Sequence, residues 1–437
     1  MISNISGFPE FLPPQQIAFD RVIRVIKHKF EQYGFIPLDT AAVERSETLL
    51  SKGNDNEIYG LVRIAEGASA KCELGLRFDL TVPLARYVAQ NYGQLVFPYR
   101  RYHIAPVWRG ERPQAGRYRQ FYQCDIDIIG DGELALLHDA EILAIICDVF
   151  NSIGVPKFTI KINSRKLLSG LIQSLGIDKD GVAQVMRIID KAEKISSEQF
   201  AAELAATGVN EAGIKLINSL IQQKYNNQEW ISYLRALSDN TEFQQGIDEI
   251  AQILDAALSF GADNHKIVID PTLARGLAYY TGIVYETKLD ECPELGSVCG
   301  GGRYANLAGS FTNKELPGVG ISIGISRLIP KMLEMGLLQG GSWAIAQVLV
   351  TTQDHTRMTD YAAIAKELRD AGIATELYLQ QKALGAQMKY ASKKGFAMAI
   401  IADSQELDAG CVNLRMLHNS EQKKIKRTDL VQTVSGS

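Results

Sequence analysis

The pattern of apolar and polar positions near the start of the chain has a helical period. Between residues 15 and 33, apolar side chains recur at intervals of three and four. This spacing places them on one face and predicts an amphipathic helix. Gly34 stands where a helix commonly ends on a left-handed glycine, and residues 35–38 are predicted to be a strand. The apolar positions of the predicted helix are Phe19, Val22, Ile23, Ile26 and Phe30.

Two further runs predict an antiparallel hairpin with a long loop. Residues 101–108 and 118–128 have strand character and flank a polar, glycine- and proline-containing loop at residues 110–117. Successive side chains of a strand point to opposite faces. One face of the second strand therefore carries Gln123, Asp125 and Asp127. The other carries Tyr122, Cys124, Ile126 and Ile128.

The remaining periodicities divide the chain. Residues 164–262 are helical in pattern, and strand-like runs resume at 266–269, 282–288 and 318–323. After Gly340 and Gly341, strands and helices alternate at 348–352, 358–371, 375–379, 384–394 and 398–402, as in a compact α/β unit. We predict one domain from residues 1–163 and 263–335, a helical insertion at 164–262, and a third domain at 341–437.

Composition narrows the class of protein. A chain of 437 residues exceeds the usual size of one core, and 46% hydrophobic with 22% charged residues is typical of globular proteins. The absence of a signal-like start and of a long apolar run predicts a cytoplasmic protein without a membrane segment. Six scattered cysteines predict reduced thiols and no zinc site. The net charge of −4 argues against non-specific coating of nucleic acid.

Positive charge is nevertheless concentrated around the predicted hairpin. Arg109 and Glu111 share a face, and the planar fork of arginine binds phosphate oxygens in pairs. The pattern is equally typical of the solvated face of a half-exposed sheet, with Arg109 and Glu111 as a surface ion pair. The residues between 100 and 119 include six arginines and one acid: Arg100, Arg101, Arg109, Arg112, Arg117, Arg119 and Glu111.

Family resemblance decides between these alternatives. The stretch WRGERPQ at residues 108–114, followed by GRYRQFYQ at 116–123, resembles motif 2 of histidyl-tRNA synthetases, which are class II enzymes. LARGLAYYTG at 273–282 and GGGRY at 300–304 resemble the two histidine-specific motifs of that family. GVGISIGISR at 318–327 resembles class II motif 3, and RFDLTVPLAR at 77–86 also matches. The region after Gly340 resembles the family's anticodon-binding domain.

The resemblance implies a fold and a reaction. The fold class is α+β, with a class II catalytic domain built on an antiparallel sheet with flanking helices, a helical insertion, and a C-terminal α/β anticodon-binding domain. The reaction joins L-histidine and ATP as histidyl-adenylate with release of pyrophosphate, and then transfers histidine to tRNA(His). The family further implies a homodimer, with residues 15–44 in the position of the dimer-forming motif 1. It also implies Mg²⁺ on the ATP phosphates.

Residue roles follow from the matched motif positions. Arg109 and Arg275 are expected to be catalytic, at the α-phosphate. Glu111, Arg117 and Arg327 complete the expected ATP site together with Arg109. The resemblance places histidine among Asp79, Thr81, Gln123, Asp127, Arg275, Tyr279, Tyr280 and Tyr304. It places tRNA contacts at Arg112 and Gln114 in the hairpin loop, and it implies no protein-bound metal.

Some positions depart from the family pattern, and two other functions are compatible with parts of it. Ala41, Ala278 and Ala305 stand where the family usually has proline, aspartate and aspartate. One rival function is the synthetase-like regulatory subunit of ATP phosphoribosyltransferase, which lacks the anticodon-binding domain and much of the arginine set. Another is a module that senses uncharged tRNA, for which we expect an appended signalling segment. Because this chain carries the arginines and the C-terminal domain, the ligase is favoured.

Overall fold

The computed structural model describes residues 3–51, 57–67, 71–112, 116–274 and 280–436. The predicted site residues Gln114, Arg275 and Tyr279 lie outside them, as does Ala278. The described chain forms two compact units. The first runs up to Glu10 and continues from Val22 to Leu338, and the second contains Phe11–Arg21 and the chain from Gln339 onward.

The second unit therefore takes in a segment that the sequence analysis assigned to the catalytic domain. Two hydrogen bonds join this segment to the residues after Leu338 in the same unit. The Gly341 amide donates to the Pro14 carbonyl at 2.9 Å, and the Arg21 guanidinium donates to the Gln339 carbonyl at 2.7 Å. Neither contact can be predicted from periodicity, because each joins residues more than 300 positions apart.

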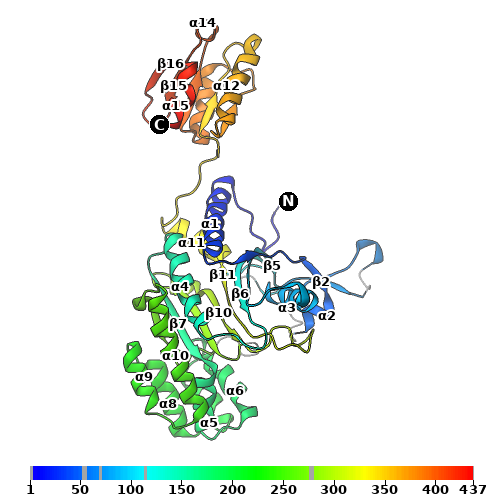
Figure 1. Ribbon diagram of the computed structural model, residues 1–437, viewed down its shortest axis with the longest axis vertical. Coiled ribbons are helices and arrows are strands. Elements are labelled where there is room, and N and C mark those ends of the chain that lie inside the picture. Colours follow the sequence, from blue (N-terminus) through cyan, green and yellow to red (C-terminus); the bar gives the residue numbers. More distant parts are fainter. Residues whose placement is uncertain (1–2, 52–56, 68–70, 113–115, 275–279, 437) are drawn as a thin grey trace. The chain divides into compact units, whose positions relative to one another are not determined.

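An eight-stranded sheet organises the first unit (Figure 1). Its order is β1-β5-β6-β11-β10-β9-β7-β8. The pairs β1/β5 and β7/β8 are parallel and the others antiparallel, so the sheet is mixed where the resemblance implied an antiparallel one. The strands are β1 Ile36–Pro37, β5 Tyr99–Trp108, β6 Gln120–Ile129, β7 Phe158–Ser164, β8 Ile267–Ile269, β9 Ile283–Leu289, β10 Ser297–Tyr304 and β11 Gly318–Gly324. A smaller sheet has the order β2-β4-β3, with β2 Val43–Arg45, β3 Gly60–Leu61 and β4 Leu74–Leu76.

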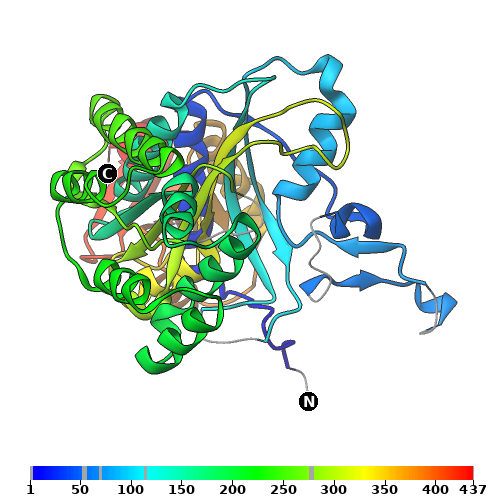
Figure 2. The same cartoon turned by 90° about the horizontal axis from the view of Figure 1, so that it is seen from below.

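Helices flank this sheet. The helices outside the insertion are α1 Pro13–Gln32, α2 Ser46–Leu50, α3 Thr81–Asn91, α4 Leu137–Ser152 and α11 Ile325–Glu334. Between β7 and β8 the chain forms α5 Arg165–Ser174, α6 Lys179–Ile189, α7 Ser197–Ala206, α8 Glu211–Gln222, α9 Asn227–Arg235 and α10 Thr241–Ser259. Figure 2 shows these six helices, in green, beyond one edge of the sheet and the blue segments around the small sheet and α3 beyond the other.

The predicted amphipathic helix and hairpin are confirmed. Helix α1 buries Phe19, Val22, Ile26 and Phe30, and Gly34 follows it with a φ of 76°. Strands β5 and β6 pair in antiparallel register around the predicted loop. Glycine has poor strand propensity, yet the triplet at residues 300–302 lies inside β10. A Cβ atom on Gly301 would lie 2.0 Å from the Gly320 carbonyl oxygen, so close strand packing requires glycine there.

The second unit has its own sheet and core. Its five strands have the order β13-β12-β14-β15-β16. Val348, Val350, Ile364, Leu368 and Ile400 are among its buried residues. The elements are β12 Val348–Val350, α12 Met358–Asp370, β13 Thr375–Leu377, α13 Leu384–Lys394, β14 Met398–Ile401, α14 Ser404–Asp408, β15 Cys411–Met416, β16 Gln422–Lys426 and α15 Leu430–Ser435. None of the helices in the described part of the chain is long and apolar enough to cross a membrane.

Candidate active site

Four neighbouring strands bring the predicted motifs together. In the sheet order, β6 lies between β5 and β11, and β11 lies next to β10. Gln123, Asp125 and Asp127 on β6 stand opposite Gly324, Ser322 and Gly320 on β11. Residues directly opposite one another in an antiparallel pair share a face. The polar face of the hairpin is therefore continued by the small residues of the motif 3 strand.

A cavity of about 140 Å³ opens beside this face. Arg109, Glu111, Arg117 and Tyr118 line it from the hairpin loop, Gln123 and Ser322 from the sheet, and Arg327 from α11. Ser297, Gly300 and Gly324 also border it. Among the described residues, three guanidinium groups and one carboxylate line this small cavity, which favours a polyanionic ligand.

Each arginine is held by a different part of the chain. The Arg109 Nε atom donates to the Phe78 carbonyl at 3.0 Å, and its guanidinium lies 5.1 Å from the centre of the Phe121 ring. Arg327 donates through Nη1 to the Ser297 carbonyl at 3.1 Å. Arg117 is half exposed and lies 3.5 Å from the Glu111 carboxylate. Two of the three cations are thus oriented by backbone oxygens.

A buried acidic face continues from Gln123 along the same side of β6. Asp127 is 4% exposed, and its Oδ2 atom lies 2.6 Å from Nη2 of the fully buried Arg101. The Tyr304 hydroxyl donates to Asp127 Oδ1 at 3.0 Å. A Cβ atom on Gly320 would lie 2.2 Å from that same carboxylate, so glycine at this position makes room for Asp127. Burial raises the pKa of Tyr304 well above its usual value, which keeps the hydroxyl a donor.

Asp79 approaches the same face from the segment before α3. Its Oδ1 atom accepts hydrogen bonds from the backbone amides of Thr81 at 3.2 Å and Val82 at 2.8 Å. Burial raises the pKa of Asp125 to about 7, and the charges of Asp127 and Asp79 add to that effect while Arg101 opposes it. Tyr280 lies beside β10, because a Cβ on Gly302 would contact its ring.

The predicted concentration of positive charge is only partly correct. Arg100 forms an ion pair at 2.9 Å with Glu141 of α4, and Arg101 is neutralised by Asp127. The expectation failed because adjacent strand residues point to opposite faces, so the six arginines do not share one surface. Arg112 is exposed in the hairpin loop and does not line the cavity.

Several residues of the site were not predicted from the sequence. Arg101 and Ser322 are the most informative, since their strand registers with β6 place them beside the acidic face. Phe121 and Tyr118 also line the cavity. Side chains alternate along β5, so Arg101 lies on the same face as Arg109. This alternation was the feature of the sequence from which the position of Arg101 could have been predicted.

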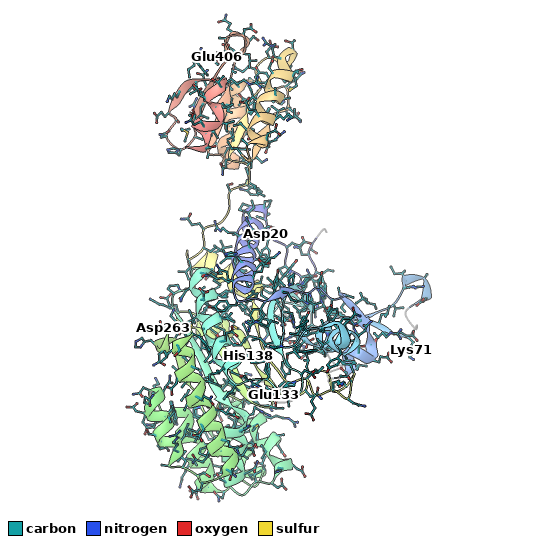
Figure 3. The ribbon with its side chains drawn as sticks, in the orientation of Figure 1. Asp20, Lys71, Glu133, His138, Asp263 and Glu406 are labelled. Atoms are coloured by element: carbon teal, nitrogen blue, oxygen red, sulfur yellow. The ribbon has the colours of Figure 1, made fainter. Side chains whose placement is uncertain are left out.

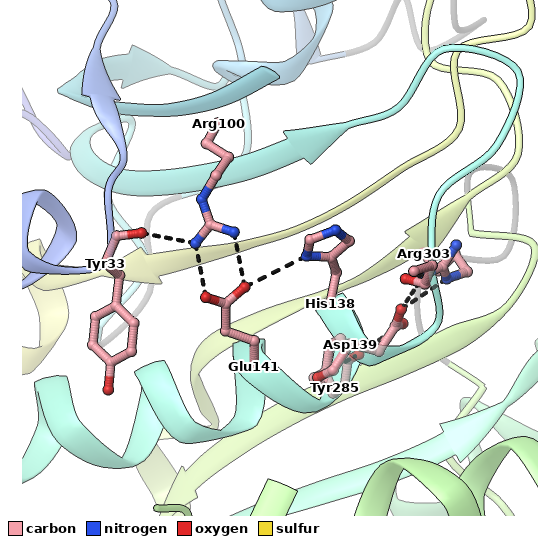
Figure 4. Close-up of polar contacts among 8 residues, drawn as sticks. Tyr33, Arg100, His138, Asp139, Glu141, Tyr285 and Arg303 are labelled. Carbon is pink, nitrogen blue, oxygen red and sulfur yellow. Dashed lines mark hydrogen bonds and ion pairs between the residues drawn. The ribbon is translucent and has the colours of Figure 1, made fainter. Parts of the chain in front are cut away.

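A second polar cluster lies on the other face of the large sheet, away from Asp127, and joins β10 to α4 (Figure 4). Asp139 is fully buried and accepts hydrogen bonds from the Tyr285 hydroxyl at 2.8 Å and from Arg303 Nε at 2.8 Å. Figure 3 labels His138, which belongs to the first turn of α4, next to Asp139 in the sequence. Because Arg303 immediately precedes Tyr304, this ion pair anchors the strand that presents the Tyr304 hydroxyl to Asp127.

The neighbouring part of the cluster joins β5 to α4. Arg100 donates both to Glu141 and, at 2.8 Å, to the Tyr33 carbonyl (Figure 4). Burial opposes ionisation of Glu141, but hydrogen bonds from His138 and Arg100 outweigh it and lower the pKa of Glu141 to about 2. The carboxylate therefore stays ionised across the physiological range and keeps β5 attached to α4.

Known proteins resemble this chain over both units. A family model described as Histidyl-tRNA synthetase matches residues 7–328, and one described as Anticodon binding domain matches residues 347–436. The chain belongs to the histidyl-tRNA synthetase family. A histidine–tRNA ligase of Clostridium tetani is 41% identical over 437 residues, which is 100% of this chain and 98% of the relative.

Solved structures agree with the family assignment. A histidyl-tRNA synthetase from Nostoc sp. PCC 7120 has a TM-score of 0.91 at 37% identity, over 100% of this chain and 99% of that one. A structure described as an ATP phosphoribosyltransferase regulatory subunit/histidyl-tRNA synthetase from Bacillus halodurans has a TM-score of 0.77 over 92% of this chain and 99% of that one. Its 19% identity shows a shared fold alone, so the regulatory alternative is not favoured. The fold is that of a class II synthetase, and the activity of the family is ligation of histidine to tRNA.

Proposed function

We propose that the cavity of the first unit forms histidyl-adenylate and that Arg109 and Arg275 bind the α-phosphate during this step. An oxygen of the histidine carboxylate attacks the α-phosphorus, an oxygen–phosphorus bond forms, and the bond from the α-phosphorus to the oxygen of the departing pyrophosphate breaks. The observation that carries this proposal is the convergence of Arg109, Arg117 and Arg327 on one cavity beside a buried acidic face. Fixed cations at developing phosphate charge stabilise the transition state more than the ground state.

ATP lies along the arginine-lined part of the cavity in this proposal. Arg117 and Arg327 bind the outer phosphates, and Glu111 orients the nucleotide. Small residues at Ser322 and Gly324 leave room for a flat base. Among the described residues Arg117 contacts Glu111 at 3.5 Å, and an exposed pair of this kind contributes little, so Arg117 can exchange this partner for a phosphate at small cost.

Mg²⁺ is proposed as the counter-ion of the ATP phosphates. In the described residues, no three His, Cys, Asp or Glu side chains are grouped to hold a metal ion. Mg²⁺ fits such a site because it usually keeps several waters and needs only one or two carboxylates besides the phosphates. Glu111 and Glu286 border the larger cleft that adjoins the arginines and would supply them. When bound, the ion neutralises charge on the phosphates.

L-Histidine is proposed to lie over the acidic face. Asp79, Thr81 and Gln123 bind its α-amino group, and Asp127 and Tyr280 bind the imidazole, with Arg275 and Tyr279 completing the site. Tyr304 is buried and acts through its hydrogen bond to Asp127. A pocket that hydrogen-bonds a polar side chain rejects analogues lacking that partner, because its own groups are then left unpaired.

The remaining proposals concern partners and location. Arg112 and Gln114 contact tRNA(His) from the hairpin loop, and the second unit, predicted to begin near residue 341, binds the anticodon. The exposure of Arg112 supports the first of these roles. We also propose a cytoplasmic homodimer, on the basis of family membership and the motif 1 segment at residues 15–44.

Histidine-dependent ATP–pyrophosphate exchange tests the assignment of the catalytic arginines. Arg109→Ala and Arg275→Ala should each slow exchange about a hundredfold or more, the effect of removing one transition-state donor. Arg63→Ala removes an arginine that is 87% exposed and serves as the matched control, with exchange unchanged. An Arg109→Ala or Arg275→Ala variant that melts early but exchanges normally would contradict the proposed role.

A further inference from the structure

A buried ion pair lies at the end of the site where the imidazole is proposed to bind. Arg101 on β5 stands directly opposite Asp127 on β6, and its Nη2 atom lies 2.6 Å from Asp127 Oδ2. Both side chains are buried. Among the described residues, no acid other than Asp127 lies within ion-pair distance of Arg101. The two charges therefore compensate one another.

Stability does not explain this pair. Two further donor atoms of Arg101, Nε and Nη1, are buried and have no hydrogen-bond partner among the described residues. Buried donors without a partner cost free energy, and replacing a buried ion pair by apolar side chains is often neutral or stabilising. A costly arrangement of this kind inside a candidate binding site indicates a functional role for the pair.

The Asp127 carboxylate is held from two sides. Arg101 contacts Oδ2 from β5, and the Tyr304 hydroxyl donates to Oδ1 at 3.0 Å from β10. Strand β11 lies between β6 and β10, and its glycines leave room for this contact. A Cβ atom on Gly318 would overlap the Tyr304 hydroxyl, and one on Gly320 would overlap the carboxylate. An ionised carboxylate only accepts hydrogen bonds and has room for about four, so these contacts are compatible with a further one from a ligand.

We propose that Arg101 is a positioning residue that holds Asp127 as an ionised, oriented acceptor for a ring N–H of the amino-acid substrate. This inference rests on the proposed function, in which Asp127 binds the imidazole. Arg101 Nη2 also donates to the Leu80 carbonyl at 3.4 Å. Because Leu80 lies between Asp79 and Thr81 in the sequence, Arg101 connects the two parts of the proposed histidine site. It acts through Asp127 and does not need to touch the substrate.

The surroundings of Asp127 show what Arg101 prevents. Without Arg101, Asp127 would be a buried carboxylate two positions from Asp125 on the same face of β6. Burial and a nearby like charge both favour the protonated form of a carboxyl group. A protonated carboxyl group carries a donor of its own. The site would then lose its preference for a ligand that donates an N–H.

Binding of two amino acids, measured by isothermal titration calorimetry, tests this role. L-Histidine donates a ring N–H. 3-(Thiazol-4-yl)alanine has the same α-amino and carboxylate groups on a five-membered ring that has no N–H. Arg101→Met removes the charge and keeps a long side chain. It should raise the histidine Kd about tenfold or more, because a charge-assisted hydrogen bond is weakened, and leave the thiazolylalanine Kd nearly unchanged. The ATP KM in pyrophosphate exchange should also stay unchanged.

Arg100→Met is the matched control. Arg100 is the preceding residue of β5, points to the opposite face and pairs with Glu141 at 2.9 Å (Figure 4). Its loss should leave both Kd values unchanged. Arg101→Lys keeps a cation beside Asp127 and serves if Arg101→Met does not fold. Because lysine lacks the planar fork of arginine, the histidine Kd alone should rise, by a smaller factor. Arg101→Met combined with Asp127→Asn removes both charges and should bind histidine no more weakly than Asp127→Asn alone.

Three results would overturn the inference. Equal weakening of both amino acids by a folded Arg101 variant would mean that Arg101 supports the packing of the pocket and not the ring contact. An unchanged histidine Kd in the folded Arg101 variants would show that Asp127 does not need Arg101. A further loss of histidine binding when Arg101→Met is added to Asp127→Asn would show that Arg101 does not act through Asp127. Wild-type protein that binds the two amino acids equally would instead refute the proposed imidazole site.

Discussion

Replacement of Asp139 by asparagine tests the buried cluster that anchors β10. The substitution keeps the size of the side chain and removes its charge. Asp139 is fully buried and accepts from Arg303 and from the Tyr285 hydroxyl. Removing one partner of a buried ion pair leaves the other charge uncompensated in a region poor in water.

The expected cost is large for a single substitution. Breaking a buried pair typically lowers the free energy of unfolding by about 3–5 kcal/mol. We expect the lower end, about 3 kcal/mol, because Arg303 keeps hydrogen bonds to the Leu134 and Ala135 carbonyls at 2.9 Å and its side chain is 16% exposed. Asp248→Asn is the matched control. It disrupts an ion pair with Arg235 whose side chains are 67% and 51% exposed, so its cost should stay below about 1 kcal/mol.

Urea unfolding followed by tryptophan fluorescence measures this difference. A Trp343→Phe background leaves Trp108 and Trp230, both in the first unit, as reporters. A double-mutant cycle with Arg303→Met isolates the interaction between Asp139 and Arg303. An Asp139→Asn cost no larger than that of Asp248→Asn, or a coupling energy near zero, would refute the account of how β10 is held.

Three further outcomes are expected. Asp127→Ala should raise the histidine KM far more than the ATP KM in pyrophosphate exchange, and equal effects on both would show that Asp127 does not face the imidazole. A chain ending at Gly340 should still form histidyl-adenylate but charge tRNA poorly, and a folded, dimeric truncation without adenylate formation would contradict the proposed division of labour. Asp125→Asn should gain thermal stability relative to wild type as pH rises from about 4 to about 7 and keep a constant advantage above that. The reason is that the pKa of Asp125 in the folded protein, about 7, lies above its ordinary value of 3.8. Below about pH 4 Asp125 is protonated in both states and costs the wild type nothing. Between about pH 4 and pH 7 the unfolded state loses this proton first, so the wild type loses stability that the asparagine variant keeps. A difference in melting temperature that does not vary with pH would show that Asp125 titrates normally.

The hairpin shows what local pattern could predict. Alternation alone placed Gln123, Asp125 and Asp127 on one face, and the structure confirms that face. Helix α1 and its terminal Gly34 also followed from spacing and conformational preference. Such features depend on residues that are close together in the sequence, so the pattern of apolar and polar residues is enough to predict them.

Other parts of the site depend on pairings between distant segments. Asp125 and Ser322 meet because β6 pairs with β11, and the whole helical segment lies between them in the chain. Arg101 pairs with Asp127 because of the register between the two strands of the hairpin. A prediction that does not fix the exact ends of the strands cannot give this register. The glycines of β10 have poor strand propensity, and close packing against β11 overrides it. The roles of individual side chains came from family resemblance, and those roles stay predictions.

ATP–pyrophosphate exchange measured separately with each of the twenty amino acids tests the central claim most directly. The account predicts exchange that depends on L-histidine and is near background with the other nineteen. Exchange that is absent with histidine, or that is supported equally by another amino acid, would contradict it.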